Sequence, residues 1–242
     1  GDHLGLNASL PATCFPTAAT IANSWDEKLG EEIGTALAEE AVTMDVNVIL
    51  GPGLNIKRSP LCGRNFEYFS EDPLVTGQFA AAMTRGIRSA GSSATVKHFA
   101  ANNQETERHN VNSVVSERAL REIYLKGFEI AVKEGNANSI MTSYNPVNGH
   151  WTASNYDLNT TILRGEWGYQ GIVMTDWWAK MNDVVNGGEA DRRYTSFMVR
   201  AQNDLYMVVN NNGAAINAAG DDTVEALEAG KLTVGELQRC AK

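Results

Sequence analysis

The sequence Gly171-Ile172-Val173-Met174-Thr175-Asp176 is a short apolar run that ends in two polar residues. Four similar runs occur along the chain, and their starts lie about 30 to 50 residues apart, which is the spacing of βαβ units. Nearly continuous apolar strands of this kind predict a parallel sheet covered by helices. The other four runs are Val46-Asn47-Val48-Ile49-Leu50, Ala94-Thr95-Val96, Ser139-Ile140-Met141-Thr142 and Leu205-Tyr206-Met207-Val208-Val209.

The segments between these runs carry the start and stop signals of helices. Residues 117–134 have apolar side chains at helical spacing, with Ser116 as the expected N-cap and Gly135 as the expected stop. Another helix is expected to begin at Pro73. The capping-box pattern, a Ser, Thr or Asp followed three residues later by Glu, predicts further helix starts at Ser24, Asp222 and Thr233.

The alternation of strands and helices favours an α/β fold of the (β/α)8 barrel type, arranged as one domain over residues 1–242. A chain of 242 residues is a natural size for such a barrel. Five runs are fewer than eight, so either further strands lack a clear pattern or the chain is a piece of a barrel.

Composition narrows the class of partner. Twenty Lys and Arg residues against 29 Asp and Glu residues give a net charge of −9, and the basic residues are scattered singly. Nucleic acid and anionic membrane surfaces are therefore not expected, whereas a neutral substrate is. No apolar stretch is long enough to cross a membrane. The three cysteines form neither a disulfide framework nor a metal knuckle, so we expect reduced thiols and a cytoplasmic protein.

Polar residues follow four of the runs, at the strand ends where parallel α/β folds place their sites. Asp176 is the most informative, because it ends an apolar strand and precedes two tryptophans. It could be a nucleophile, a general base or a metal ligand, or it could only cap a helix. Cationic neighbours keep a carboxylate ionised, as a nucleophile requires, and they repel a metal ion. We therefore expect Asp176 to be a nucleophile, and we expect no metal and no cofactor. The candidate neighbours are Arg64, Lys97, His98, Tyr144, Trp177 and Trp178, and their hydrogen-bond donors and flat rings suit a sugar.

Several long motifs, in order, resemble glycoside hydrolase family 3, of the β-glucosidase type. They are Gly51-Pro52-Gly53-Leu54-Asn55-Ile56, Cys62-Gly63-Arg64-Asn65-Phe66-Glu67-Tyr68-Phe69-Ser70-Glu71-Asp72-Pro73, Lys97-His98-Phe99-Ala100-Ala101-Asn102-Asn103-Gln104-Glu105, Ser143-Tyr144-Asn145 and Val173-Met174-Thr175-Asp176-Trp177.

The resemblance implies the N-terminal barrel of that family and retaining hydrolysis of terminal, non-reducing β-D-glucosyl residues without a metal. It makes Asp176 the catalytic nucleophile. The same resemblance assigns sugar binding to Arg64, Lys97, His98, Tyr144 and Trp177.

The sequence departs from the family pattern in three places. The family's Asp-Gly-Pro-His-Gly stretch would precede Gly1, so the barrel is expected to be incomplete at its N-terminus. The general acid/base usually lies in a following α/β sandwich domain, which would come after Lys242. Ala100-Ala101-Asn102 stands where relatives that act on N-acetylglucosaminides carry Pro-Gly-His, which argues against that activity. The chain alone is therefore expected to turn over glucosides weakly or not at all, and its open strand edges to favour association, including homo-oligomers.

Three alternatives remain open from the sequence. The chain could be a sugar-binding barrel without catalysis, or it could act on β-xylosides. It could also be a different barrel enzyme, such as an aldolase in which Lys97 forms a Schiff base with a carbonyl substrate. Borohydride would trap that adduct. A secreted protein is compatible with the sequence, because any signal peptide would precede Gly1.

Overall fold

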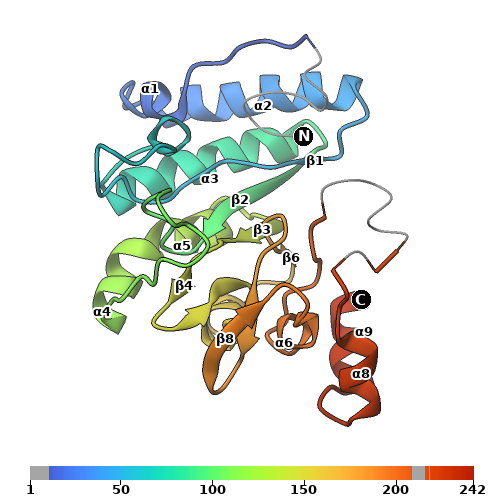
Figure 1. Cartoon of the computed structure of the whole chain (residues 1–242). Coiled ribbons are helices and arrows are strands. Elements are labelled where there is room, and N and C mark those ends of the chain that lie inside the picture. Colours follow the sequence, from blue (N-terminus) through green and yellow to red (C-terminus); the bar gives the residue numbers. More distant parts are fainter. Residues whose placement is uncertain (1–10, 209–215, 218) are drawn as a thin grey trace. The chain divides into compact units, whose positions relative to one another are not determined.

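The computed structural model describes residues 11–208, 216–217 and 219–242 (Figure 1). The chain divides into two compact units. The first comprises Gly1–Thr106 and Ser116–Ile140, and the second comprises Glu107–Val115 and Met141–Lys242. Among the described residues, no helix is both long and apolar enough to cross a membrane.

The first unit consists mainly of helices beside short strands. Its elements are α1 (Ala18–Ala22), α2 (Glu27–Thr43), β1 (Val48–Ile49), the 3-10 turn η2 (Asn65–Glu67), α3 (Pro73–Ser89), β2 (Ser93–Phe99), α4 (Glu117–Ala119), the π-helical turn η3 (Leu120–Tyr124), α5 (Lys126–Lys133) and the first half of β3 (Ser139–Thr142).

Helices α2 and α3 pack closely because glycine lies at their contact. A Cβ atom at Gly34 would lie 2.5 Å from the Met83 carbonyl oxygen, and one at Gly86 would collide with the Glu31 carbonyl oxygen. Larger residues would therefore force the two backbones apart. Helix α3 begins where the sequence predicts, because the Asp72 carboxylate accepts hydrogen bonds from the first free N–H groups of the helix.

Strand β2 is buried over nearly its whole length and contains two ionisable residues, Lys97 and His98. It pairs in parallel with β1, and a further parallel bridge joins Gly53 to Lys97. The segment that follows β1 therefore runs beside the carboxyl end of β2. In the strand order, the first half of β3 comes next to β2.

The second unit contains short strands, two hairpins and several helices. Its elements are the second half of β3, β4 (Pro146–Val147), β5 (His150–Trp151), the 3-10 turn η4 (Thr152–Ser154), the π-helical segment η5 (Asp157–Glu166), β6 (Ile172–Met174), β7 (Met181–Asp183), β8 (Gly187–Asp191), α6 (Thr195–Arg200), α8 (Thr223–Glu228) and α9 (Val234–Ala241). β4 pairs with β5 and β7 with β8, both antiparallel.

The core of the second unit gathers around Met181 of β7, Met198 of α6 and Ala226 of α8. Beside it, Asp204 joins three segments of this unit. Its carboxylate lies 2.6 Å from Nη2 of Arg164 and 3.2 Å from Nη1 of Arg239, and it accepts a hydrogen bond from the N–H of Val173 in β6. The end of β6 is thereby fixed by a buried ion pair and by a parallel bridge from Met174.

The predicted α/β class with parallel strands is confirmed. The strand order is β1-β2-β3-β6, and no pairing among the described residues returns from β6 to β1 to close a barrel. The predicted run 205–209 contributes one bridge, at Leu205, and its last residue lies outside the described residues. The (β/α)8 barrel, its incompleteness and the single domain over 1–242 stay predictions.

Two of the three predicted capping boxes do not form, each for a physical reason, although α8 (Thr223–Glu228) does begin directly after Asp222 as predicted. Helix α2 takes Asp26 as its N-cap, because the Asp26 carboxylate reaches the N–H groups of the first turn, while Ser24 donates to a carbonyl of α1. The Asp222 carboxylate binds the N–H and hydroxyl of Ser196 instead of its own helix. The capping box at Thr233 and the N-cap at Ser116 are confirmed.

Candidate functional site

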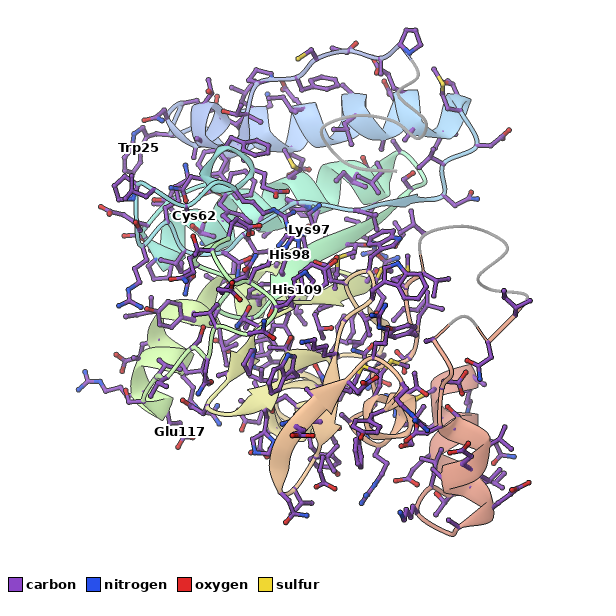
Figure 2. The ribbon with its side chains drawn as sticks, in the orientation of Figure 1. Trp25, Cys62, Lys97, His98, His109 and Glu117 are labelled. Atoms are coloured by element: carbon purple, nitrogen blue, oxygen red, sulfur yellow. The ribbon has the colours of Figure 1, made fainter. Side chains whose placement is uncertain are left out.

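The site residues that the sequence predicts are divided between the two units, and the residues of each unit are described here as a first and a second group. The first group lies around the carboxyl end of β2, where Lys97 and His98 are each 2% exposed. Figure 2 shows these two residues next to each other on the strand. Ionisable side chains are seldom buried to this extent unless they have partners, so the contacts of the two residues define the group.

Glu67 links the two cations of this first group. Its carboxylate binds Nε of Arg64 through Oε1, and Oε2 lies 3.5 Å from Nζ of Lys97. The side chains of Glu67 and Lys97 are 3% exposed and that of Arg64 is 20% exposed. Burial alone would lower the pKa of Arg64, but its interactions with Tyr68 and Glu67 outweigh burial and raise that pKa above its usual value. The group therefore presents two charged donors that share one carboxylate.

A second chain of hydrogen bonds orients His98. The Tyr68 hydroxyl and His98 Nδ1 are 3.0 Å apart, and Asn102 Nδ2 donates to the same hydroxyl at 3.2 Å. Because Tyr68 accepts from Asn102, its own proton is directed to Nδ1, which assigns the Nε2–H tautomer to a neutral His98. Burial raises the pKa of Tyr68 well above its usual value, so this phenol stays protonated. Nε2 of His98 is thus a hydrogen-bond donor.

Asn55 holds the backbone of β2 at the same place. Its side-chain amide donates to the His98 carbonyl at 2.9 Å and accepts from the His98 N–H at 2.8 Å. This pair of bonds replaces the pairing that a neighbouring strand would supply. The main chain of His98 is therefore as well fixed as its ring, and a site with fixed donors loses little entropy when it binds a ligand.

Asp176 belongs to the second group, which lies in the second unit. It follows β6 directly and is 7% exposed, and its Oδ1 accepts a hydrogen bond from the N–H of Trp177 at 2.8 Å. The Thr175 hydroxyl accepts from the N–H of Met207, which ties the strand end to the segment after Leu205. The alternative that Asp176 caps a helix is wrong, because a turn and then β7 follow it.

Aromatic side chains complete the second group. Tyr144 follows β3, is 8% exposed and packs against His109, with ring centroids 4.1 Å apart. The guanidinium of Arg108 lies 4.9 Å from the centre of the Tyr144 ring. Trp177 is half-buried. The guanidinium carbon of Arg192 lies 5.9 Å from the centre of the Trp178 ring. The contacts with His109 and Arg108 hold the Tyr144 ring in a fixed orientation.

Arg64, Lys97 and His98 belong to the first group, and Tyr144, Asp176 and Trp177 belong to the second. Sequence reasoning missed the residues that hold the first group in place. They are Asn55, Glu67, Tyr68 and Asn102.

Metal ligation has no support from side-chain clustering in the part of the chain that the structure describes. No group of three or more His, Cys, Asp or Glu side chains there is arranged to hold a metal ion. Arg64 and Lys97 instead give the first group the chemistry of a hydroxyl-binding site: charged and neutral donors on a fixed frame.

Comparison with known proteins gives one family and close relatives. The family model described as "Glycosyl hydrolase family 3 N terminal domain" matches residues 4–242. A solved structure of a β-glucosidase from Paenibacillus barengoltzii is similar with a TM-score of 0.97 and 68% identity, over 99% of this chain and 26% of that one. A β-glucosidase from Ruminococcus albus is 52% identical over 98% of this chain and 24% of its own length.

A third relative differs in the sugar that its name specifies. An exo-α-(1→6)-L-arabinopyranosidase from Bifidobacterium breve is 42% identical over 98% of this chain and 29% of its own length. The chain thus spans 24% of the length of the first of these curated relatives and 29% of the second.

Proposed function

Since this chain belongs to glycosyl hydrolase family 3, through the N-terminal domain of that family, we propose that it supplies the sugar-binding residues and the nucleophile of a retaining β-glucosidase. The observation that carries the proposal is the likeness to relatives named β-glucosidase over 98–99% of the chain. With that family we also propose the (β/α)8 barrel as the architecture and one domain over residues 1–242.

The proposed chemistry begins with Asp176. One oxygen of its carboxylate attacks C1 of the terminal glucosyl residue while the bond from C1 to the leaving oxygen breaks, and the leaving oxygen takes a proton from a general acid. Water then attacks C1 of the glycosyl-enzyme, gives its proton to the same group as a base, and releases glucose with its configuration retained. The hydrogen bond from the Trp177 N–H supports this role, because it holds the carboxylate in a fixed orientation.

The proposed role of the first group is to bind the hydroxyl groups of the sugar. Arg64, Lys97 and the Nε2–H of His98 are donors, and the Glu67 carboxylate and the Tyr68–Asn102 pair hold them in place. Tyr144 and Trp177 offer flat faces to the C–H groups of a pyranose. The general acid/base is proposed to lie outside this chain, in an α/β sandwich domain of the full protein.

The experiment isolates the nucleophile by removing the need for an acid. The chain is incubated with a 2,4-dinitrophenyl 2-deoxy-2-fluoro-β-glucoside, whose leaving group departs without a proton and whose fluorine slows the second step. Intact-protein mass is then measured. We expect one fluoroglucosyl group on the chain and none on Asp176→Ala. Asp183→Ala is the matched control, since Asp183 also ends a strand of the second unit, and it keeps the label.

A folded chain without the added mass contradicts the proposed nucleophile, unless the label appears in the full gene product that carries this chain. That second measurement separates a wrong assignment from a requirement for the rest of the protein. A label that persists in Asp176→Ala contradicts the assignment directly. Acid assistance is worth about 10² to 10⁴ in rate, so natural disaccharides are expected to react far more slowly than this reagent with the chain alone.

A second candidate function is hydrolysis of a pentopyranoside. The relative named exo-α-(1→6)-L-arabinopyranosidase supports it, because its sugar, like xylose, lacks the exocyclic CH2OH of glucose. The test compares kcat/KM for 4-nitrophenyl β-glucoside, β-xyloside and α-L-arabinopyranoside in the full gene product. A preference for either pentoside would replace glucose as the substrate and leave the role of Asp176 unchanged.

A further inference from the structure

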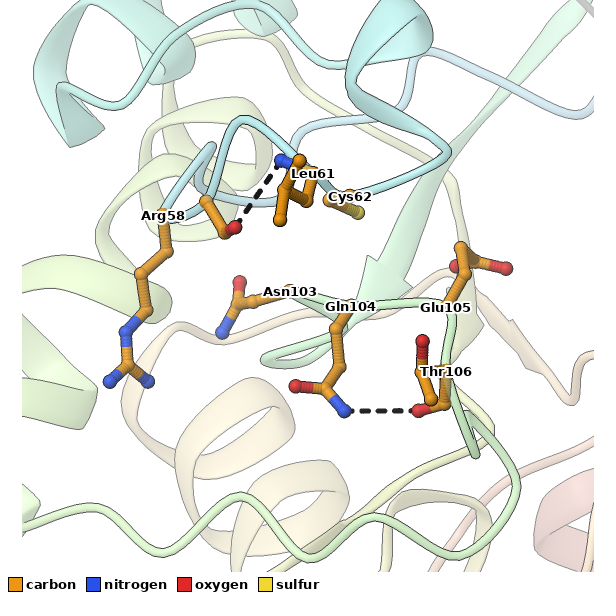
Figure 3. A pocket seen from close by; sticks show the side chains of 8 residues that line it. Arg58, Leu61, Cys62, Asn103, Gln104, Glu105 and Thr106 are labelled. Atoms are coloured by element: carbon orange, nitrogen blue, oxygen red, sulfur yellow. Dashed lines mark hydrogen bonds between the residues drawn. The ribbon is translucent and has the colours of Figure 1, made fainter.

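Residues 107–115 form a segment of the second unit, the strap, that carries His109 against Tyr144. The residues that precede the strap, 103–106, belong to the first unit and line a pocket there together with segment 58–62 (Figure 3). Every residue of the strap is described, and apart from one β-bridge none belongs to a helix or strand. The position of the strap therefore depends on contacts that other parts of the second unit supply.

A tryptophan side chain holds the strap at His109. Trp151 lies on β5, and its indole Nε1 donates to the His109 carbonyl at 3.0 Å. The indole N–H can only donate, so this bond is its one polar interaction and fixes the His109 main chain at one point. Next to it, Lys180 Nζ donates to Asn110 Oδ1 at 2.9 Å, but that bond is exposed and water competes for both groups. The partly buried Trp151 bond is therefore the firmer of the two.

The backbone of Trp151 is itself fixed by a buried amide. Asn182 on β7 is fully buried, and its Oδ1 accepts from the Trp151 N–H at 3.0 Å. Its Nδ2 donates to the Gly149 carbonyl in the turn of the same hairpin, at 2.9 Å. A buried amide whose oxygen and nitrogen are both used resists displacement, because any shift leaves a polar atom without a partner. Asn182 thus holds the β4–β5 hairpin, and with it the indole of Trp151, in one place.

The residue that Trp151 holds is the residue that contacts Tyr144. The rings of His109 and Tyr144 have centroids 4.1 Å apart and planes tilted by 46°. Tyr144 is 8% exposed, so its ring has little room to move while His109 is in place. The carbonyl that accepts from the indole and the ring that packs on Tyr144 both belong to His109. A displaced carbonyl would therefore displace the ring as well.

From these contacts we infer that Trp151 is a positioning residue of the sugar-binding site and acts on Tyr144 through His109. The inference rests on the proposed function, in which Tyr144 contacts the sugar. The role of Trp151 is indirect: its indole N–H keeps His109 on the Tyr144 ring. Loss of that N–H weakens sugar binding, because only the fraction of molecules with a correctly placed Tyr144 binds at full strength.

The experiment measures the affinity for glucose in the full gene product, as the inhibition constant of glucose against hydrolysis of 4-nitrophenyl β-glucoside. Trp151→Phe keeps an aromatic ring on β5 and removes the N–H. We expect the inhibition constant to rise about two- to tenfold, which is the effect of one lost hydrogen bond between neutral groups, and kcat to change less. His109→Ala is expected to raise the constant at least as much, whereas His109→Phe, which keeps a ring on Tyr144, is expected to restore most of the affinity.

Tyr169→Phe is the matched control. It also removes one hydrogen bond from an aromatic side chain to a backbone carbonyl of the second unit, because the Tyr169 hydroxyl donates to the Ile172 carbonyl at 2.9 Å. Thermal denaturation is expected to show a similar loss of stability in Tyr169→Phe and Trp151→Phe. Only Trp151→Phe is expected to raise the inhibition constant of glucose.

A double variant separates positioning from a general loss of order. Because Trp151 acts through His109, Trp151→Phe is expected to raise the constant little further in a protein that already carries His109→Ala. Equal constants in Trp151→Phe and Tyr169→Phe overturn the inference, and so does an undiminished effect of Trp151→Phe beside His109→Ala, while cleavage of the aryl glucoside upholds the proposed function. If the unaltered, folded protein does not cleave the aryl glucoside, the proposed function fails together with this inference.

Discussion

Replacement of Glu67 by glutamine tests the frame that holds the proposed sugar-binding group. The carboxylate of Glu67 lies 3.5 Å from Nζ of Lys97, and both side chains are 3% exposed. Two unit charges at that distance attract by about 5 kcal/mol when the effective dielectric constant is about 20. Removal of one partner of a buried pair costs about 3 to 5 kcal/mol, because it leaves the other charge without compensation. Glutamine keeps one acceptor oxygen for Arg64, so we expect a loss near the lower value, about 3 kcal/mol.

The assay is urea denaturation of the chain, followed by circular dichroism. Glu122→Gln is the control, because Glu122 pairs with Arg118 at 3.1 Å but its side chain is 61% exposed. An exposed pair of that kind contributes less than about 1 kcal/mol. The double variant Glu67→Gln with Lys97→Met removes the uncompensated cation as well, so its loss is expected to be smaller than the sum of the two single losses. Equal losses in Glu67→Gln and Glu122→Gln, or strict additivity in the double variant, would refute the reasoning.

Three further outcomes follow from the packing and the ionisation of other residues. Gly86→Ala places a methyl group against the backbone of α2 and is expected to lower the free energy of unfolding by about 1 to 3 kcal/mol. Gly235→Ala lies in the open first turn of α9 and is expected to raise the free energy of unfolding by up to about 1 kcal/mol. Urea denaturation measures both. Burial raises the pKa of Tyr206 to about 12. The contribution of the Tyr206 hydroxyl to stability is therefore complete below pH 10 and is lost as the pH rises from 10 to 12. Tyr206→Phe is expected to flatten the dependence of the free energy of unfolding on pH over that range. Asp204→Asn leaves two arginines without their carboxylate and is expected to lower the free energy of unfolding by about 3 kcal/mol in the same assay.

Local sequence signals predicted those elements whose determinants lie close together in the chain. β3 has the bounds that were predicted, and α3 begins at Pro73 because the capping aspartate immediately precedes it. The helix start at Asp222 is confirmed, since Asp222 is the N-cap residue of α8, but its side chain makes no capping bond because Ser196, 26 residues away, binds the same carboxylate. The β7–β8 hairpin was missed although Asn186-Gly187 is a turn signal, with Gly187 at φ +67°.

The candidate site shows the same division between local and distant determinants. Arg64 and Glu67 are three residues apart in a 3-10 turn, so their contact could have been predicted from spacing. The contact of Glu67 with Lys97 joins residues 30 positions apart. No periodicity records such contacts, because they depend on the parallel bridge that brings Gly53 beside Lys97. Sequence reasoning therefore named Arg64, Lys97 and His98 but missed Asn55, Glu67 and Tyr68, which hold them in place.

The charge of the first group bears on which ligand it can take. Arg64 and Lys97 share one carboxylate, so much of their charge is already compensated before any ligand arrives. A phosphorylated or otherwise anionic ligand would have to compete with Glu67 for both cations, whereas hydroxyl groups can accept from N–H groups that remain beside the carboxylate. The whole chain, at a net charge of −9, would also repel an anion at long range. The buried ion pair thus favours a neutral ligand for the same physical reason that the composition does, which agrees with the proposed sugar substrate.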